Sequence, residues 1–122
     1  MNPITWVEIP VSDMERAVKC YNTLFGWDLK IIDLGDLTMA WFPNDEKRVG
    51  ASGTLILQES YVPSQEGALV YFESDDVQIQ VDRFASAGCS LIKNKSQISP
   101  DHGYMAAALD SEGNRIAFHS IK

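Results

Sequence analysis

Residues 9–27 read IPVSDMERAVKCYNTLFGW, and this stretch contains a strand end, a helix start, an amphipathic helix and a helix stop. Residues 5–11, which lead into it, alternate in the manner of a half-buried strand. Trp6 and Glu8 take one face of that strand. The other face is formed by Val7, Ile9 and Val11. An apolar strand face followed directly by an amphipathic helix predicts a βα unit, which needs a packing partner to bury itself.

The helix within this stretch has a predicted start and a predicted end. Ser12 and Glu15 have the spacing of a capping box, in which each side chain accepts a hydrogen bond from the other residue's amide. Gly26 is suited to the left-handed conformation that ends a helix. Between them, apolar residues at helical spacing predict one buried stripe: Met14, Ala17, Val18, Tyr21, Leu24 and Phe25.

Composition places limits on the class of protein. The 122 residues are 45% hydrophobic and 22% charged, as expected for a single globular domain with a core of its own. The formal charge of −7 argues against nucleic-acid and anionic-membrane partners, and no apolar run is long enough to span a bilayer. The N-terminus lacks the pattern of a secretory signal, and Cys20 and Cys89 have no metal-site spacing. We therefore expect a cytoplasmic protein with two reduced thiols.

The sequence contains an internal repeat, in which the second half matches the pattern of the first at an offset of 62 residues. This offset aligns Ser74-Asp75 with Ser12-Asp13 and Gly88 with Gly26. The predicted order in each half is β-α-β-β-β, an α+β pattern, within one domain spanning residues 1–122. We divide it into module one (1–60), a linker (61–67) and module two (68–122). The predicted strands are 5–11, 28–33, 37–42, 54–58, 68–73, 89–94, 103–109 and 115–121, with helices ending at the two glycines.

The sequence resembles the vicinal oxygen chelate superfamily in three features taken together: the two βαβββ modules, the opening IPVSDMERAVKCYNTLFGW and the closing LDSEGNRIAFHS. That superfamily includes glyoxalase I, extradiol dioxygenases and the bleomycin- and fosfomycin-resistance proteins. The resemblance implies a cupped mixed sheet with helices on its convex side and a reaction or binding site in the concavity. It also implies a homodimer.

The resemblance further implies which residues face the cup: Trp6, Glu8, Leu69, Tyr71, Glu73, Ala117 and His119. Metal-using members carry one ligand on each of four strands. Three of those positions fall on Trp6, Leu69 and Ala117, and the fourth lies within 54–58, which holds no acid or histidine. None of these residues is a suitable ligand for a divalent cation, so no metal cofactor is expected. The alternative is a displaced site built from Glu8, His102 and His119.

Several residues are candidates for contacts with a ligand. Trp6, Tyr71 and Tyr104 can form aromatic walls for a planar molecule, whereas Trp41 is expected to fill the core. Glu8 is expected either at the wet mouth of the cup or paired with Arg115 or His119, because burying it unpaired would cost several kcal/mol. His102 is expected in a loop that can cover the cavity.

Three functions follow as hypotheses. The first is a metal-independent protein that binds a small apolar or aromatic molecule, oriented by Glu8 and His119. The second is an enzyme, related to the lyases, isomerases or dioxygenases of the superfamily, that uses Glu8 and His119 as acid and base or as displaced metal ligands. The third is a scaffold or regulatory partner that binds no ligand because its own side chains fill the cup.

Overall fold

The computed structural model describes residues 2–122 and contains the two predicted βαβββ units. The elements of the first are β1 (Trp6–Pro10), α1 (Met14–Phe25), β2 (Ile31–Asp33), β3 (Thr38–Trp41) and β4 (Ser52–Leu57). Those of the second are β5 (Val70–Glu73), α2 (Val77–Ala87), β6 (Ser90–Ser99), β7 (Gly103–Leu109) and β8 (Arg115–Ser120). The α+β class and the order of elements are therefore confirmed. No helix in residues 2–122 has the length and apolar character needed to cross a membrane.

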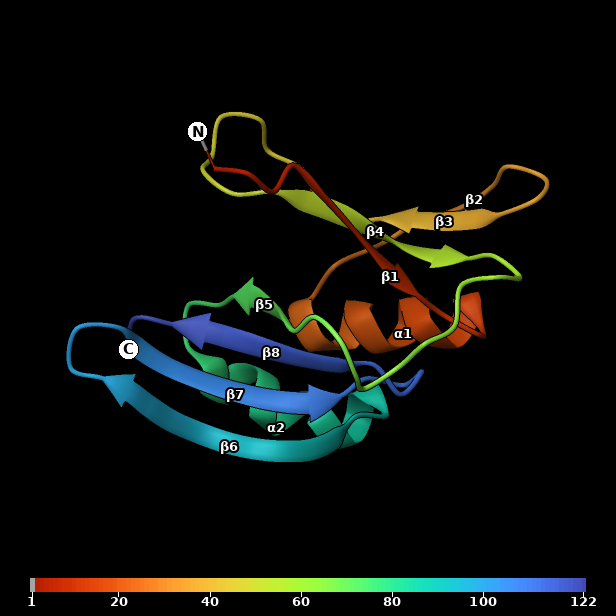
Figure 1. Cartoon of the computed structure of the whole chain (residues 1–122). Coiled ribbons are helices and arrows are strands. Elements are labelled where there is room, and N and C mark those ends of the chain that lie inside the picture. Colours follow the sequence, from red (N-terminus) through yellow and green to blue (C-terminus); the bar gives the residue numbers. More distant parts are fainter. Residues whose placement is uncertain (1) are drawn as a thin grey trace.

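The strands form two four-stranded mixed sheets, ordered β1-β4-β3-β2 and β5-β8-β7-β6. In each sheet the first strand pairs in parallel with the last strand of its unit, and the remaining pairs are antiparallel. The two units keep separate ladders within this fold, because β1 and β5 are both edge strands. In Figure 1, α1 lies between the two sheets and α2 lies behind the second.

The helix starts differ from the prediction by one or two residues. Asp13, and not Ser12, is the N-cap of α1, and its carboxylate accepts a hydrogen bond from the Arg16 amide at 3.1 Å. The Ser12 amide instead donates to the side chain of Glu112, so the predicted capping box does not form. Asp76 caps α2 in the same way, one residue beyond the predicted Ser74-Asp75. Both predicted stops are confirmed, since Gly26 and Gly88 have φ values of 70° and 80°.

Strand β6 is the largest departure from the predicted boundaries. It extends to Ser99, whereas the sequence predicted its end at Asn94. Most of its residues are exposed, it lies at the edge of its sheet, and its pairing with β7 contains three register shifts. A polar edge strand with such irregularities lacks the regular apolar alternation by which strands are recognised in a sequence.

The core is continuous between the two units because aromatic rings from both meet around α1. The Phe25 ring lies 5.1 Å from that of Phe72 on β5 and 5.7 Å from that of Phe118 on β8. Tyr21 is fully buried and stacks on Phe42 of the first unit at 5.8 Å. These separations are typical of favourable aromatic pairs. Helix α1 therefore packs against both sheets.

The turn between β7 and β8 ties the two units together by polar contacts. Glu112 accepts hydrogen bonds from the amides of Ser12 and Asp13, each at 2.8 Å, and from the Arg16 guanidinium at 2.7 and 2.9 Å. Burial would raise the pKa of the Glu112 carboxyl, but the bonds from Arg16 and from the two amides outweigh it and lower that pKa to about 2. A residue of the second unit thus satisfies the amino end of the helix in the first.

Candidate functional site

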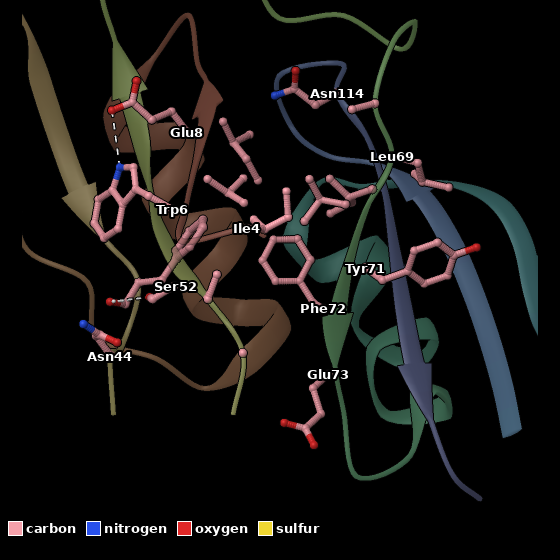
Figure 2. Close-up of a pocket in the computed structure, with 18 of the residues that line it drawn as sticks. Ile4, Trp6, Glu8, Asn44, Ser52, Leu69, Tyr71, Phe72, Glu73 and Asn114 are labelled. Atoms are coloured by element: carbon pink, nitrogen blue, oxygen red, sulfur yellow. Dashed lines mark hydrogen bonds between the residues drawn. The ribbon is translucent and has the colours of Figure 1, made fainter. Parts of the chain in front are cut away.

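A cavity of about 1190 Å³ lies between the two edge strands β1 and β5. Its walls come from the segment before β1 and β1 itself, the loop from β3 to β4, the segment leading into β5, β5 itself and the start of β8. Figure 2 shows Trp6 and Glu8 on one side, with Leu69, Tyr71, Phe72 and Glu73 on the other. The space is large enough for a drug-sized molecule. The two units therefore bracket one shared cavity.

The first wall is held by close packing of β1 on β4. Gly53 pairs with Val7, and a Cβ atom on Gly53 would lie 2.1 Å from the Val7 carbonyl oxygen, so only glycine fits there. This packing places Trp6, which is 43% exposed, on the cavity side of β1. The Trp6 indole nitrogen donates to the Glu8 carboxylate at 3.4 Å. Glu8 is exposed and bonds to neither Arg115 nor His119 within residues 2–122. Of the two positions expected for Glu8, the solvent-exposed mouth of the cavity is therefore the one observed.

The second wall is β5, whose alternating side chains divide between cavity and core. Phe72 points between the units, where its ring packs against those of Phe25 and Phe42 in the core, while Tyr71 points across the second sheet and borders the cavity from that side. Tyr71 is 50% exposed, which leaves much of its ring available for contact. Glu73 lies at the end of β5, where its carboxylate is 3.6 Å from the Arg48 guanidinium of the β3–β4 loop. This ion pair joins the two units across the cavity.

The charged residues that line the cavity are mostly acidic. Four are carboxylates and two are guanidinium groups: Glu8, Asp45, Glu66 and Glu73, with Arg48 and Arg115. Arg48 is already paired with Glu73. Electrostatics at this site therefore favour a neutral or cationic molecule over an anion.

Three of the six predicted ligand-contacting residues line this cavity, and three lie elsewhere. Trp6, Glu8 and Tyr71 are brought together around it. His119 does not line the cavity, and its Nε2 lies 2.7 Å from the carbonyl oxygen of His102. Tyr104 packs against the core, with the Lys95 ammonium 4.8 Å from its ring centre. The predicted acid–base pair is therefore not assembled in one cavity.

Two further expectations concern residues near these walls. Trp41 was expected in the core but is 53% exposed, because it lies opposite Thr54 on the sheet face turned away from α1. His102 is exposed, and its Nδ1 lies 2.6 Å from the Ser99 hydroxyl. These contacts close the β6–β7 turn, which does not border the cavity.

The residues at the expected metal positions do not fit a divalent cation. The Trp6 nitrogen is a hydrogen-bond donor to Glu8, and Leu69 and Ala117 carry no ligand atom. On β4, Thr54 lies opposite Glu8, but its hydroxyl is buried and donates to the carbonyl of Leu55. Within residues 2–122, no three His, Cys, Asp or Glu side chains gather as a ligand set.

Sequence reasoning did not anticipate the part that loops play in the cavity. Arg48 and Val49 belong to the loop before β4, and Val62 and Ser64 to the segment before β5. The signal that could have identified them is topological. Parallel pairing of β1 with β4 places the start of β4, and so the loop that leads to it, beside the start of β1.

The fold and the cavity place the chain among proteins built from paired βαβββ modules. A family model described as the Glyoxalase/Bleomycin resistance protein/Dioxygenase superfamily matches residues 3–118. The chain belongs to that superfamily, as the sequence motifs predicted. It is also 26% identical over 119 residues to a glyoxylase-like domain-containing protein of Didymella fabae, a match that covers 93% of this chain and 90% of that protein.

Solved structures with the same fold share little sequence with this chain. A glyoxylase/bleomycin resistance protein/dioxygenase domain from Frankia sp. EAN1pec has a TM-score of 0.73 at 14% identity, with 98% of each chain covered. Glyoxalase I from Zea mays has a TM-score of 0.70 at 16% identity. That match covers 98% of this chain but 46% of the maize enzyme, so this chain spans about half of the maize protein's length. These similarities establish the fold.

Proposed function

We propose that the protein binds a small apolar or aromatic molecule in the cavity between β1 and β5, without a divalent metal. The observation that carries this proposal is the cavity of about 1190 Å³ with half-exposed aromatic rings on its margins, Trp6 on β1 and Tyr71 on β5. Large aromatic side chains left in contact with water at a concave site provide surface that a planar ligand can bury.

The charges around the cavity narrow the class of ligand. Carboxylates outnumber guanidinium groups, so a neutral or cationic ring system is favoured. Glu8, beside the Trp6 ring edge, is placed to accept a hydrogen bond or to pair with a positive charge on the ligand. Its role here is to orient the ligand, and His119 has no part in it because His119 lies outside the cavity.

The alternative of a scaffold whose own side chains fill the cup is not favoured. That hypothesis requires Trp6 and Tyr71 to be buried, and both are about half exposed beside a large cavity. The expected homodimer and cytoplasmic location remain predictions.

The proposal is tested by thermal unfolding against a panel of neutral and cationic aromatic compounds and, separately, divalent metal salts. A ligand at 100 times its dissociation constant adds about 2.7 kcal/mol of apparent stability. We expect stabilisation by at least one aromatic compound, retained in the presence of a chelator.

Matched variants locate the effect. Trp6→Ala and Tyr71→Ala should weaken binding of that compound. Tyr61→Ala should not, because Tyr61 is 43% exposed but does not line the cavity. Stabilisation by a metal ion, lost in Glu8→Gln, would overturn the claim of metal independence. Equal loss of binding in the Tyr61 variant would show that the cavity is not the site.

A further inference from the structure

The two cysteines of the chain lie in contact, although 69 positions separate them in the sequence. Cys20 lies in α1, and Cys89 directly follows Gly88, the residue that ends α2. Their sulfur atoms are 3.5 Å apart, and both residues are free thiols. Cys20 is fully buried, whereas Cys89 is partly exposed. Cys89 thus keeps part of its surface exposed, whereas Cys20 has none.

The surroundings keep these sulfur atoms together. Helices α1 and α2 pack against each other, and the β7–β8 turn lies beside the pair, since a Cβ atom on Gly88 would be 3.9 Å from the Ser111 side chain. Next to Cys20, the Tyr21 hydroxyl donates to the Asp110 carboxylate of that turn at 2.6 Å. A disulfide has a sulfur–sulfur distance of about 2.05 Å, so the atoms must approach by about 1.5 Å to bond.

We propose that Cys20 and Cys89 are an oxidation site that forms an intramolecular disulfide with a low-molecular-weight disulfide such as glutathione disulfide. In the first step the Cys89 sulfur attacks one sulfur of the reagent, whose disulfide bond breaks. One glutathione thiol leaves with the proton from Cys89. In the second step the Cys20 sulfur attacks the Cys89 sulfur, and the second glutathione thiol leaves with the other proton. Two protein thiols are oxidised and one glutathione disulfide is reduced.

The electrostatics of the reduced pair make Cys20 the more acidic of the two thiols. A hydrogen bond from Cys89 lowers the pKa of the Cys20 thiol, and this effect outweighs the opposing effect of burial. The same hydrogen bond, with burial, raises the pKa of the Cys89 thiol. Once Cys89 is in a mixed disulfide it has no proton to donate to Cys20, so the order of the two steps rests on exposure, because Cys89 is partly exposed and Cys20 is buried.

The bond would join the first βαβββ unit to the second. Cys20 belongs to the helix of one unit and Cys89 to the helix–strand connection of the other. The cavity lies between the same two units, at β1 and β5, so the cross-link would fix the units relative to each other on the helix side.

The test is treatment of the reduced, folded protein with glutathione disulfide, followed by alkylation and intact-mass measurement. The proposal predicts a product that takes up no alkylating agent, is about 2 Da lighter than the reduced chain and is monomeric without reductant. Peptide mapping without reduction should recover the peptides of Cys20 and Cys89 joined together. A mixed disulfide that persists, two alkylated thiols or a cross-link between chains would each overturn the proposal.

Two variants assign the roles. Cys20→Ser should stop at a stable glutathione adduct on Cys89, because the second thiol is missing. Cys89→Ser should take up glutathione far more slowly, since Cys20 is buried. Rapid modification of the Cys89 variant would contradict the order of steps. Peptide mapping of the unaltered protein decides whether the disulfide forms even if a variant folds poorly.

Discussion

Replacing Glu112 with glutamine should destabilise the protein at neutral pH and have little effect in acid. The Glu112 side chain is fully buried and accepts from two amides at the start of α1, from the Arg16 guanidinium and from the Ser111 hydroxyl. Glutamine keeps one acceptor oxygen but places an amide nitrogen toward Arg16. Arg16 is 53% exposed and can be solvated, so the loss lies in the charge-assisted bonds received by the carboxylate.

The magnitude follows from the pKa of Glu112, which falls from an ordinary value of 4.5 to about 2 in the folded protein. With about 1.4 kcal/mol for each tenfold change in proton affinity, ionised Glu112 contributes about 3 kcal/mol. Because the folded-state pKa is the lower one, this contribution is complete above about pH 5 and is lost as the pH falls toward 2.

The assay is urea unfolding of the wild type and Glu112→Gln at a series of pH values between 7 and 2. The difference in unfolding free energy should shrink from about 3 kcal/mol at pH 7 toward zero near pH 2. Glu59→Gln is the control, because Glu59 is exposed and forms no ion pair within the described residues. A difference that does not change with pH, or one below about 0.5 kcal/mol at pH 7, would show that ionised Glu112 does not stabilise the fold in this way.

Three further predictions concern stability. Asp13→Ala should lower the unfolding free energy measured in urea by about 1 kcal/mol, because it removes the cap of α1. Ser12→Ala should change that free energy by less than about 0.5 kcal/mol. A larger loss in the Ser12 variant than in the Asp13 variant would show that Ser12 is the cap after all. Gly53→Ala should lower the unfolding free energy by about 1–3 kcal/mol, because the added Cβ atom would meet the Val7 carbonyl oxygen. The same change should weaken ligand binding by displacing β1. An unchanged melting temperature would contradict this packing. Tyr21→Phe should cost about 1.5–3 kcal/mol by removing the hydrogen bond to buried Asp110, and calorimetry showing no loss would contradict it.

The fold was largely readable from the sequence because its signals are local. Alternation around Val7 and Ile9 and the glycines at 26 and 88 each specify one element, and their recurrence at one offset specifies the repeat. The cap of α1 was missed for a non-local reason. Ser12 has the right spacing for a cap, but Glu112 from the far end of the chain occupies its amide. No local pattern contains that contact.

The candidate site was readable only in part, for a related reason. Strand alternation correctly placed Trp6, Glu8 and Tyr71 on the cavity, because a side chain's face follows from its position in the strand. His119 has the correct alternation but lies on β8, one strand further into the sheet than its register partner Glu73 on β5, which does line the cavity. Alternation gives a side chain's face and not its distance across the sheet from the cleft. Arg48 comes from a loop, whose position depends on the pairing of strands far apart in sequence.

The most direct test of ligand binding between β1 and β5 is a crystal structure of the protein with the best aromatic compound from the stability screen. We predict that the compound lies in the cavity between the two strands, in contact with Trp6 and Tyr71 and with no metal ion bound to it. A compound held through a metal ion, or bound elsewhere while this cavity contains only solvent, would contradict it.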